Sequence, residues 1–511
     1  MNVGHKLFRL MTVFMLLSGA LIPGLSSPAQ VQAANLHPLL AQLAAEAPKQ
    51  TVAVIVQKAA ASNQAEVLTA QLGGKVMKDL GIINAFAAEM TAGAARQLAA
   101  SPSVRWVSPD APVQEAGGGG GGGTTPKNYY LDTLGVRQVW NMGRQGQGLT
   151  IAVIDSGVSE DADFGASEQG NFGSHIVRRM SFNTNSQTVN DVYGHGTHVA
   201  GIIGGNGAGS SGAFQGVAPQ VNLIGLKISD ESGMAYESDT VEAMQWVLDN
   251  KAAYNIRVVN LSINSTVEQS YHTSPLDAAT EILWFNGIVV VVSAGNKGPS
   301  GTYNTANAAP ANDPFVITVG ASDEKATTKL NDDSIASYSA YGVTVDGFSK
   351  PDIIAPGTSI YSVLSRNSSW GTQYPGRLAY NGEYFRLSGT SMAAPMVAGA
   401  VALLLQDEPN LTPDQVKYRL LNAGNTISGS SSDPRRSYPY LNVYKAVTGT
   451  TTQSANTGLQ ASQMLWSGSE PVTWGSVNWN SVNWNSVNWN SVNWNSVNWN
   501  SVNWNSTHWG P

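Results

Sequence analysis

The chain contains no cysteine among its 511 residues. Disulfide bonds, a thiolate nucleophile and cysteine-bound zinc are therefore excluded, so stability has to come from packing. Charged residues make up only 12% of the chain, and the formal net charge of −7 leaves no basic excess. Because nucleic-acid binding relies on clustered lysine and arginine, we exclude that class of function. The apolar content of 42% is ordinary for a protein with large buried cores.

Residues 1–33 have the order of a secretory signal peptide. Lys6 and Arg9 precede a mostly apolar run from Leu10 to Leu25, and small residues follow as far as Ala33. The alternative is a membrane anchor, but the run is short for a membrane span and is interrupted by glycine and proline. We therefore predict a secreted, extracellular protein.

Residues 34–116 read as a small domain of their own. From Thr51 to Val113, strand and helix patterns alternate in the order β, α, β, β, α, β, which is typical of an α+β ferredoxin-like unit. Seven consecutive glycines, Gly117 to Gly123, follow it. No packed element would tolerate such a run, so residues 117–124 are predicted to be a flexible linker.

Residues 125–448 combine continuous apolar runs with amphipathic segments between them. The runs occupy residues 149–154, 221–228, 256–263, 287–294 and 315–320. Continuous apolar strands separated by helices predict an α/β fold, a doubly wound parallel sheet covered by helices on both faces. In such sheets the reactive groups collect at the carboxyl edge.

Four polar residues lie where strands end or helices begin in this region. Asp155 ends a strand in AVIDSGV, His195 lies in GHGTHVAG, Asn296 follows VVVVSAG, and Ser391 opens the helix of SGTSMAAP. Each has a common structural alternative, a turn for Asp155 and Asn296 and a helix cap for Ser391. Together they supply a nucleophile, a base, a carboxylate to orient the base and a donor for an oxyanion.

A second histidine, His198, lies one helical turn beyond His195. It could be a packed side chain or a metal ligand, but no third ligand is evident nearby. We predict no metal-binding residues and no cofactor required for the chemistry.

The four motifs resemble the signature blocks of the subtilisin-like serine proteases, the subtilases, in the family's own order of Asp, His and Ser. The resemblance covers residues 125–448. It implies that Ser391 attacks a peptide carbonyl, that His195 takes the proton and that Asp155 orients the imidazole. Asn296 and the backbone N–H of Ser391 would hold the oxyanion. The implied function is hydrolysis of peptide bonds in protein or peptide substrates through an acyl-enzyme.

The resemblance also places the substrate. An extended peptide would pair with backbone around 233–236 and 261–264. The substrate-binding residues implied are Gly233, Tyr236, Ser262, Asn264, Gly295 and Lys297.

Two of these positions depart from the family pattern. Asn264 stands where relatives usually have a glycine in a pocket wall, which would make that wall narrower or more polar. Lys297 stands where relatives often have an acidic residue. We therefore predict that it tolerates or favours an acidic side chain at the substrate residue before the scissile bond. Calcium is common in the family, but its ligands cannot be mapped here, because the loop 204–216 has no carboxylate.

For residues 34–116 the resemblance implies an inhibitory propeptide that acts on its own protease, so that the chain is a self-processing zymogen. The polyglycine linker would be an accessible place for self-cleavage. The alternative is a permanent accessory domain, since fold analogy by itself is a weak argument. A segment at 366–385, just before the nucleophile motif, is predicted to border the cleft.

The C-terminal part is predicted to be a polar linker over 449–475 and a low-complexity tail over 476–511. SVNWN occurs six times in this tail. Exposed tryptophan favours contact with a cell surface or a polysaccharide, whereas the alternative is a tail that folds back or is trimmed off. A rival function follows from it, a noncatalytic adhesin that keeps the protease scaffold and binds through the tail. A binding module would not need an intact triad, so we prefer the protease.

Overall fold

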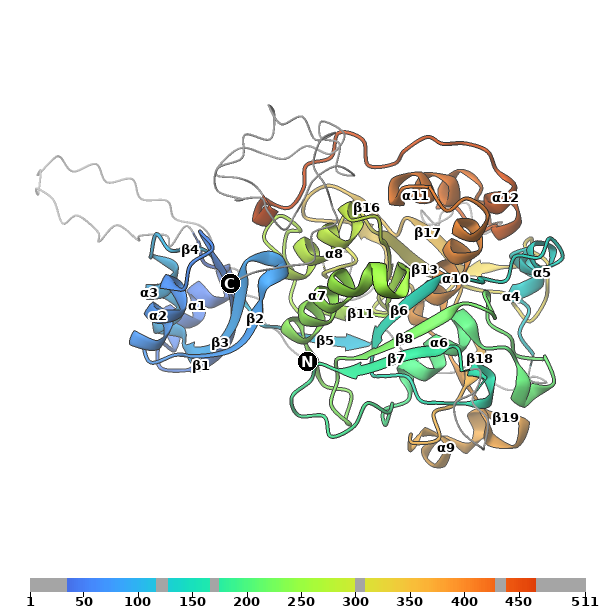
Figure 1. The fold of residues 1–511 in the computed structure, drawn as a ribbon, viewed down its shortest axis with the longest axis horizontal. Coiled ribbons are helices and arrows are strands. Elements are labelled where there is room, and N and C mark those ends of the chain that lie inside the picture. Colours follow the sequence, from blue (N-terminus) through green and yellow to red (C-terminus); the bar gives the residue numbers. More distant parts are fainter. Residues whose placement is uncertain (1–34, 116–126, 166–173, 299–307, 428–437, 466–511) are drawn as a thin grey trace, which may run out of the picture.

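The computed structural model describes residues 35–115, 127–165, 174–298, 308–427 and 438–465. The predicted signal peptide, the polyglycine linker and the SVNWN tail lie outside these residues. The described chain forms a small N-terminal domain, residues 35–111, and a large domain that begins at residue 127 (Figure 1). The two domains pack against each other.

The N-terminal domain is an antiparallel sheet with strand order β2-β3-β1-β4. Its elements are α1 (Pro38–Glu46), β1 (Thr51–Lys58), α2 (Gln64–Gln71), β2 (Lys75–Leu80), η1 (Gly81–Ile83), β3 (Ala85–Thr91), α3 (Ala92–Ala99) and β4 (Val104–Pro109). Side chains alternate between the two faces of each strand. Val54, Val56 and Phe86 pack with the domain's own helices, whereas Ile55 and Ala87 join the core of the large domain.

The large domain is built on a sheet with the order β14-β13-β12-β10-β6-β8-β7, in which β17 also pairs with β13. All of these pairings are parallel except that of β14. The strands are β6 (Thr150–Asp155), β7 (Ile176–Ser181), β8 (Asn222–Lys227), β10 (Ile256–Leu261), β12 (Val289–Ser293), β13 (Ile317–Asp323), β14 (Ser334–Ile335) and β17 (Ile353–Pro356). The five apolar runs in the sequence form β6, β8, β10, β12 and β13, and the predicted α/β fold is confirmed.

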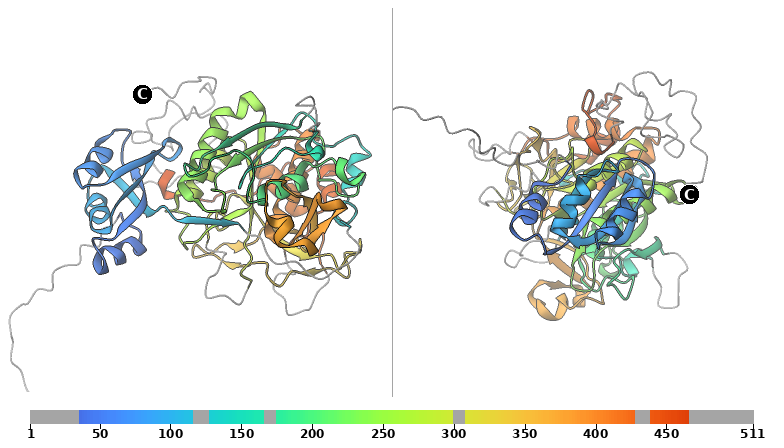
Figure 2. Two further views of the ribbon diagram at one scale, coloured as in Figure 1. Left: turned by 90° about the horizontal axis from the view of Figure 1, so that it is seen from below. Right: turned by 90° about the vertical axis from the view of Figure 1, so that its left-hand side faces the viewer.

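Helices cover both faces of this sheet (Figures 1 and 2). On one face α6 (His195–Gly204) packs against α10 (Thr390–Asp407), and on the other α7 (Glu237–Tyr254) packs against α8 (Pro275–Phe285). Among the described residues, α10 alone is long and apolar enough to cross a membrane, but it is buried against the strands. Its apolar character therefore reflects its place in the core.

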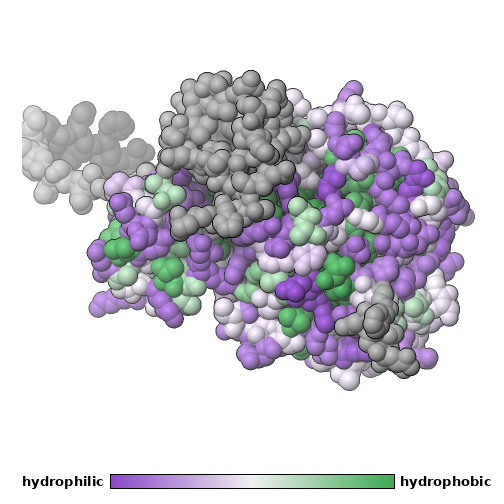
Figure 3. All heavy atoms as spheres, viewed as in Figure 1, coloured by the Kyte–Doolittle hydropathy of each residue, from purple (hydrophilic) through white to green (hydrophobic). Residues whose placement is uncertain are grey.

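Shorter elements complete the large domain. They are α4 (Tyr130–Thr133), α5 (Val136–Trp140), η2 (Ala162–Phe164), η3 (Ala208–Ser210), β15 (Gly342–Val343), β16 (Ser349–Lys350), β18 (Ile360–Val363), α9 (Trp370–Gln373), η5 (Pro375–Arg377), β19 (Leu378–Ala379), η6 (Tyr380–Gly382), β20 (Tyr384–Leu387), α11 (Pro413–Asn422), α12 (Val443–Thr448) and η8 (Gln463–Leu465). The face of the molecule seen in Figure 3 is mostly hydrophilic, with hydrophobic residues in separate small groups.

One strand connects the domains. β5 (Pro112–Glu115) leaves the N-terminal domain and lies between β9 (Ala235–Tyr236) and β11 (Ile263–Ser265) of the large domain, antiparallel to both. The three strands form a small sheet of their own. Residues 112–115 are therefore held by backbone pairing on both sides.

Candidate active site

Asp155 and His195 form a buried pair at the carboxyl edge of the parallel sheet. Asp155 is the last residue of β6 and His195 the first of α6, and neither is more than 1% exposed. Asp155 Oδ1 lies 2.8 Å from His195 Nδ1. A carboxylate can only accept, so Nδ1 carries the proton and the other ring nitrogen, Nε2, has the lone pair that a general base needs.

The glycine beside the histidine allows this pair to form. A Cβ on Gly196 would lie 2.1 Å from the carbonyl oxygen of Gly157 and 3.0 Å from Cβ of Asp155. No side chain fits there, because contacts shorter than 3 Å are repulsive. The motif GHGTH thus has a steric reason for its second glycine.

Asp191 is a buried carboxylate that the sequence motifs did not single out. Its Oδ1 accepts from the Gly194 backbone N–H at 2.6 Å and from Ser156 Oγ at 2.9 Å, and its Oδ2 accepts from the Thr197 N–H at 2.7 Å. These bonds tie the strand end at Asp155 to the first turn of α6. Asp191 lies three residues before the N-cap Gly194, so the usual sequence signal of a capping residue does not identify it.

Ser391 lies in the first turn of α10 and is fully buried in this structure. Its Oγ donates to the carbonyl oxygen of Ser262 at 3.1 Å, and Ser262 Oγ donates back to the carbonyl oxygen of Ser391 at the same distance. Ser262 directly follows β10, which pairs with β6, so the serine is held at the same sheet edge as Asp155. The backbone N–H of Ser391 has no acceptor within its own helix, because it lies in the first turn.

Asn296 is held next to this helix start by Thr390. The Asn296 Oδ1 atom accepts from the Thr390 N–H at 2.9 Å and from Thr390 Oγ1 at 3.1 Å. Thr390 Oγ1 in turn accepts from the Gly295 N–H at 3.0 Å. Since its oxygen is held by residue 390, the amide presents its NH₂ group on the opposite side. Thr390 is a second positioning residue that the motifs did not identify.

His198 is a packed side chain. Its Nε2 donates to the carbonyl oxygen of Phe385 at 2.9 Å, and burial lowers the pKa of His198 to about 3. The ring therefore stays neutral at physiological pH. Of the two alternatives that the sequence left open, the structure shows the packed one.

The residues expected to bind substrate flank β5. Glu115 pairs with Ile263 and Gln114 with Asn264 on one side, and Pro112 pairs with Tyr236 on the other. The two segments expected to pair with an extended peptide, 233–236 and 261–264, thus pair with a segment of this chain. The structure brings both segments to the sheet edge that carries Ser262.

The other expected pocket residues have diverse surroundings. Gly233 has a φ of 88° and lies against Tyr193, where a Cβ would come within 2.7 Å of the ring. The Asn264 side chain is buried and donates from Nδ2 to the carbonyl oxygen of Ser293 at 3.0 Å, so it ties β11 to the end of β12. Lys297 is exposed.

The segment 366–385 packs beside the histidine loop. Ser368 Oγ donates to the Tyr193 carbonyl oxygen at 2.9 Å, and the Trp370 ring meets the Tyr193 ring edge-on at 5.2 Å. Gly194 fits closely under this segment, because a Cβ there would lie 2.6 Å from Ser368 Oγ. The segment therefore borders the loop that leads into His195.

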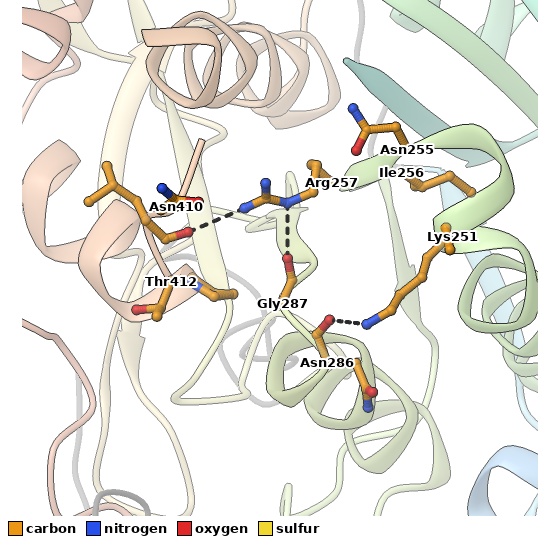
Figure 4. Close-up of a pocket in the computed structure, with 11 residues that line it drawn as sticks. Lys251, Asn255, Ile256, Arg257, Asn286, Gly287, Asn410 and Thr412 are labelled. Carbon is orange, nitrogen blue, oxygen red and sulfur yellow. Dashed lines mark hydrogen bonds between the residues drawn. The ribbon is translucent and has the colours of Figure 1, made fainter. Parts of the chain in front are cut away.

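The described residues contain no metal cluster, and a surface pocket lies away from this site. Among the described residues, no group of three or more His, Asp or Glu side chains is placed to hold a metal ion. A surface pocket of about 300 Å³ contains Lys251 and Arg257, but both donate to backbone carbonyls, Lys251 to Asn286 and Arg257 to Gly287 and Leu411 (Figure 4). It lies at the start of β10, the end of that strand opposite to Ser262.

An acid, a base and a serine hydroxyl at one edge of a parallel sheet, in the chain order Asp, His, Ser, are typical of serine proteases with an α/β fold. The comparisons with known proteins agree. A family model described as the subtilase family matches residues 146–458. The chain belongs to the subtilase family, as the resemblance of its motifs predicted, and it is a subtilisin-like serine protease.

Two relatives and one solved structure show the extent of the similarity. Serine protease AprX of Bacillus subtilis (strain 168) is 38% identical over 294 residues, which cover 57% of this chain and 63%, less than two thirds, of AprX. Subtilisin NAT of Bacillus subtilis subsp. natto is 32% identical over 359 residues, 70% of this chain and 80% of that protein. The fold resembles that of fervidolysin from Fervidobacterium pennivorans, with a TM-score of 0.61 at 23% identity, over 81% of this chain and 63% of that one.

Proposed function

We propose that this chain is a secreted serine endopeptidase made as a self-processing zymogen. Ser391 is the nucleophile, His195 the general base and Asp155 the residue that orients it. Substrates are proteins and peptides that bind in an extended conformation between β9 and β11. The predicted signal peptide supports export.

The geometry supports each chemical role. Proton transfer from Ser391 Oγ to His195 Nε2 would leave an imidazolium whose Nδ1–H already faces the Asp155 carboxylate at 2.8 Å. The pair is buried, so the stabilisation of that cation is weakly screened by water. The same histidine then delivers the proton to the leaving amine, and water repeats the sequence on the acyl-enzyme.

The oxyanion is assigned to two donors near the start of α10. One is the Ser391 backbone N–H, which lies at a helix N-terminus where negative charge is favoured. The other is Nδ2 of Asn296, whose amide is oriented by its two hydrogen bonds from Thr390. Preorganised donors of this kind need no rearrangement as charge develops.

The observation that carries the proposal is the position of β5. An extended stretch of this chain, residues 112–115, is paired on both sides in the place where the family resemblance puts substrate. A peptide held there cannot be displaced without breaking two sets of backbone hydrogen bonds. The arrangement supports residues 34–116 as an inhibitory propeptide and cleavage in the adjoining polyglycine stretch.

Polar contacts between the domains support the same assignment. Lys78 Nζ of the N-terminal domain lies 2.7 Å from Asp239 Oδ1 and 2.6 Å from Glu242 Oε2 on α7. Asp110 accepts from the N–H and from Oγ of Ser238, at 2.9 and 2.6 Å, at the start of the same helix. The Lys78 contacts pair opposite charges, and the Asp110 contacts join the residues just before β5 to the first turn of α7.

The test compares the full chain with its Ser391→Ala variant. The unmodified chain should convert to a shorter form and hydrolyse casein. The variant should stay full-length and lose activity on the order of a million-fold, the loss seen when the serine of a subtilisin is removed. Equal processing and equal casein hydrolysis in the two chains would refute the proposal.

A further inference from the structure

The stretch after α12 does not leave the molecule as a free linker. Residues 449–465 run along the large domain, and the Arg419 guanidinium donates from Nε to the Thr451 carbonyl oxygen at 2.9 Å and from Nη1 to that of Gly449 at 2.6 Å. Asn456 Nδ2 donates to Asp414 Oδ1 at 2.7 Å. The described part of the predicted linker is therefore anchored to α11.

The end of this stretch is buried beside α8. Ser462 is fully buried, its N–H donates to Glu281 Oε2 at 2.7 Å, and its Oγ donates to the His272 carbonyl oxygen at 3.0 Å. Tyr271 donates its hydroxyl proton to the carbonyl oxygen of Gln460 at 2.9 Å. We call residues 460–465 the C-terminal strap.

The strap also bonds to the N-terminal domain. Gln57 of β1 donates from Nε2 to the Met464 carbonyl oxygen at 2.7 Å, and Arg105 of β4 donates from Nη2 to that of Gln463 at 2.7 Å. Met464 and Leu465 are at most 7% exposed and belong to the apolar cluster that includes Ile55. The strap thus touches both domains. It follows the large domain in the sequence, whereas β5 precedes it.

We propose that the C-terminal strap is a second anchor that retains the N-terminal domain on the protease. Release of that domain then requires the strap contacts to break as well as the β5 pairing. Activation of the enzyme is consequently controlled by its own C-terminal segment. This inference rests on the proposed role of residues 34–116 as a propeptide.

The physical basis is the cost of separating these groups. Gln57 is only 2% exposed, and without the Met464 carbonyl oxygen its buried amide keeps one of its two acceptors, the carbonyl oxygen of Ile83. A hydrogen bond from a charged donor such as Arg105 is stronger than a neutral one. Without the strap, we expect the N-terminal domain to dissociate at least about tenfold faster.

The experiment separates docking from self-processing. In the Ser391→Ala chain, a recognition sequence for a site-specific protease is inserted into Gly117–Gly123, and the added protease cuts the linker. The dissociation rate of the N-terminal fragment is then measured for chains that end at Leu465 and at Leu459. The chain ending at Leu465 should match the full-length chain, and the chain ending at Leu459 should release the fragment at least about tenfold faster.

A double-mutant comparison distinguishes loss of the strap contact from a folding defect. Arg105→Ala should speed release in the chain that ends at Leu465 and add nothing in the chain that ends at Leu459, because the strap carbonyl oxygens of Gln463 and Met464 are then absent. Arg96→Ala, an exposed arginine on α3, is the matched control and should change neither. If truncation at Leu459 unfolds the large domain, the comparison of Arg105→Ala with Arg96→Ala in the full-length chain decides.

Two results would overturn the inference: equal release from the two truncated chains, or the same effect of Arg105→Ala with and without the strap. Because the linker is cut by an added protease, neither result depends on the activity of the chain. Strap-dependent release from the cut Ser391→Ala chain, together with an unmodified chain that does not process itself, would leave the inference standing and refute the zymogen proposal. Self-processing of the unmodified chain, together with release that does not depend on the strap, would refute the inference and leave the zymogen proposal standing.

Discussion

The two principal sheets of this protein are buried in different ways. In the large domain, β6 and β12 are buried along their whole length, because the domain's own helices cover both faces of the sheet. In the N-terminal domain, one face carries the domain's own helices and the other, with Ile55 and Ala87, is completed by the large domain.

This difference has a functional consequence. The large domain covers both faces of its sheet with its own helices, whereas the N-terminal domain depends on docking to cover one face of its sheet. On the proposal that residues 34–116 are an inhibitory propeptide, this dependence favours irreversible removal once the linker is cut, because the free form exposes apolar surface. The comparison predicts that changes at the catalytic edge alter chemistry but not docking, and that changes at the domain interface do the opposite.

Among changes that leave the triad intact, the largest effect is expected for Asn296→Ala. In subtilisins, loss of the equivalent side-chain donor lowers kcat by about 100- to 1000-fold, and we expect the same range here. Docking of the N-terminal domain should not change. Steady-state kinetics on a peptide substrate and the melting temperature test this, with Asn331→Ala at an exposed position as the control. A loss below tenfold would contradict the assignment of the oxyanion donors.

The next effect concerns pH and the interface. Burial raises the pKa of Asp110 from its ordinary 3.8 to about 6 in the docked state, against the opposing effect of hydrogen bonds from Ser238. The docked state therefore holds a proton more tightly than the free state. The stabilisation of the docked state by this proton is complete below pH 3.8 and is lost as the pH rises through 6.

We thus expect the dissociation constant of the cut Ser391→Ala complex to increase by up to about 100-fold as the pH rises from well below 3.8 to well above 6, at tenfold for each pKa unit. Asp110→Asn should flatten the profile. Docking that tightens as the pH rises in this window would contradict the prediction. Catalytic turnover of a fully processed enzyme should not follow this profile.

A smaller effect is expected for Lys78→Met. Burial opposes the charge of Lys78, but Asp239 and Glu242 outweigh it and raise the pKa of Lys78. The substitution leaves the buried Asp239 carboxylate without Lys78, which should weaken docking about tenfold. The Lys78–Glu242 ion pair adds little to this effect, because Glu242 is partly exposed and the pair is screened by water. The same release assay measures it, and Lys75→Met, at an exposed position of the same strand, should have no effect.

The smallest effect is expected for Lys297→Glu. If Lys297 attracts acidic side chains before the cut, the charge reversal should change the ratio of kcat/KM for acidic over basic peptides by several-fold, since exposed charges interact weakly. Lys329→Glu, at another exposed position, is the control. An unchanged ratio would remove Lys297 from the specificity determinants.

Much of the large domain could be predicted because its signals are local. Strand β6 is a continuous apolar run that ends in Asp155, and Ser391 follows a glycine and opens a helix rich in small residues. Strands β7 and β17 were not predicted. β7 carries two arginines and is half exposed, and β17 is only four residues long and ends in proline, so neither shows the pattern of a buried strand.

The supporting residues were harder to predict, because their partners are distant in sequence. Thr390 is 94 residues from Asn296, and Gln57 is 407 residues from Met464. A threonine before a serine, or a glutamine in a strand, carries no local signal of such a contact. The substrate segments were expected from the family resemblance, but nothing in residues 112–115 themselves indicated the strand that lies between them.

By itself, the sequence determined that this is a serine protease of the subtilase family and that Asp155, His195 and Ser391 lie among small residues. Those features are local, since an apolar strand and a glycine-flanked side chain need only their immediate neighbours. The tertiary structure alone decided how the chain restrains that chemistry. Placing β5 between two strands, and the strap against Gln57 and Arg105, depends on side chains and backbone groups that meet only after the two domains have packed.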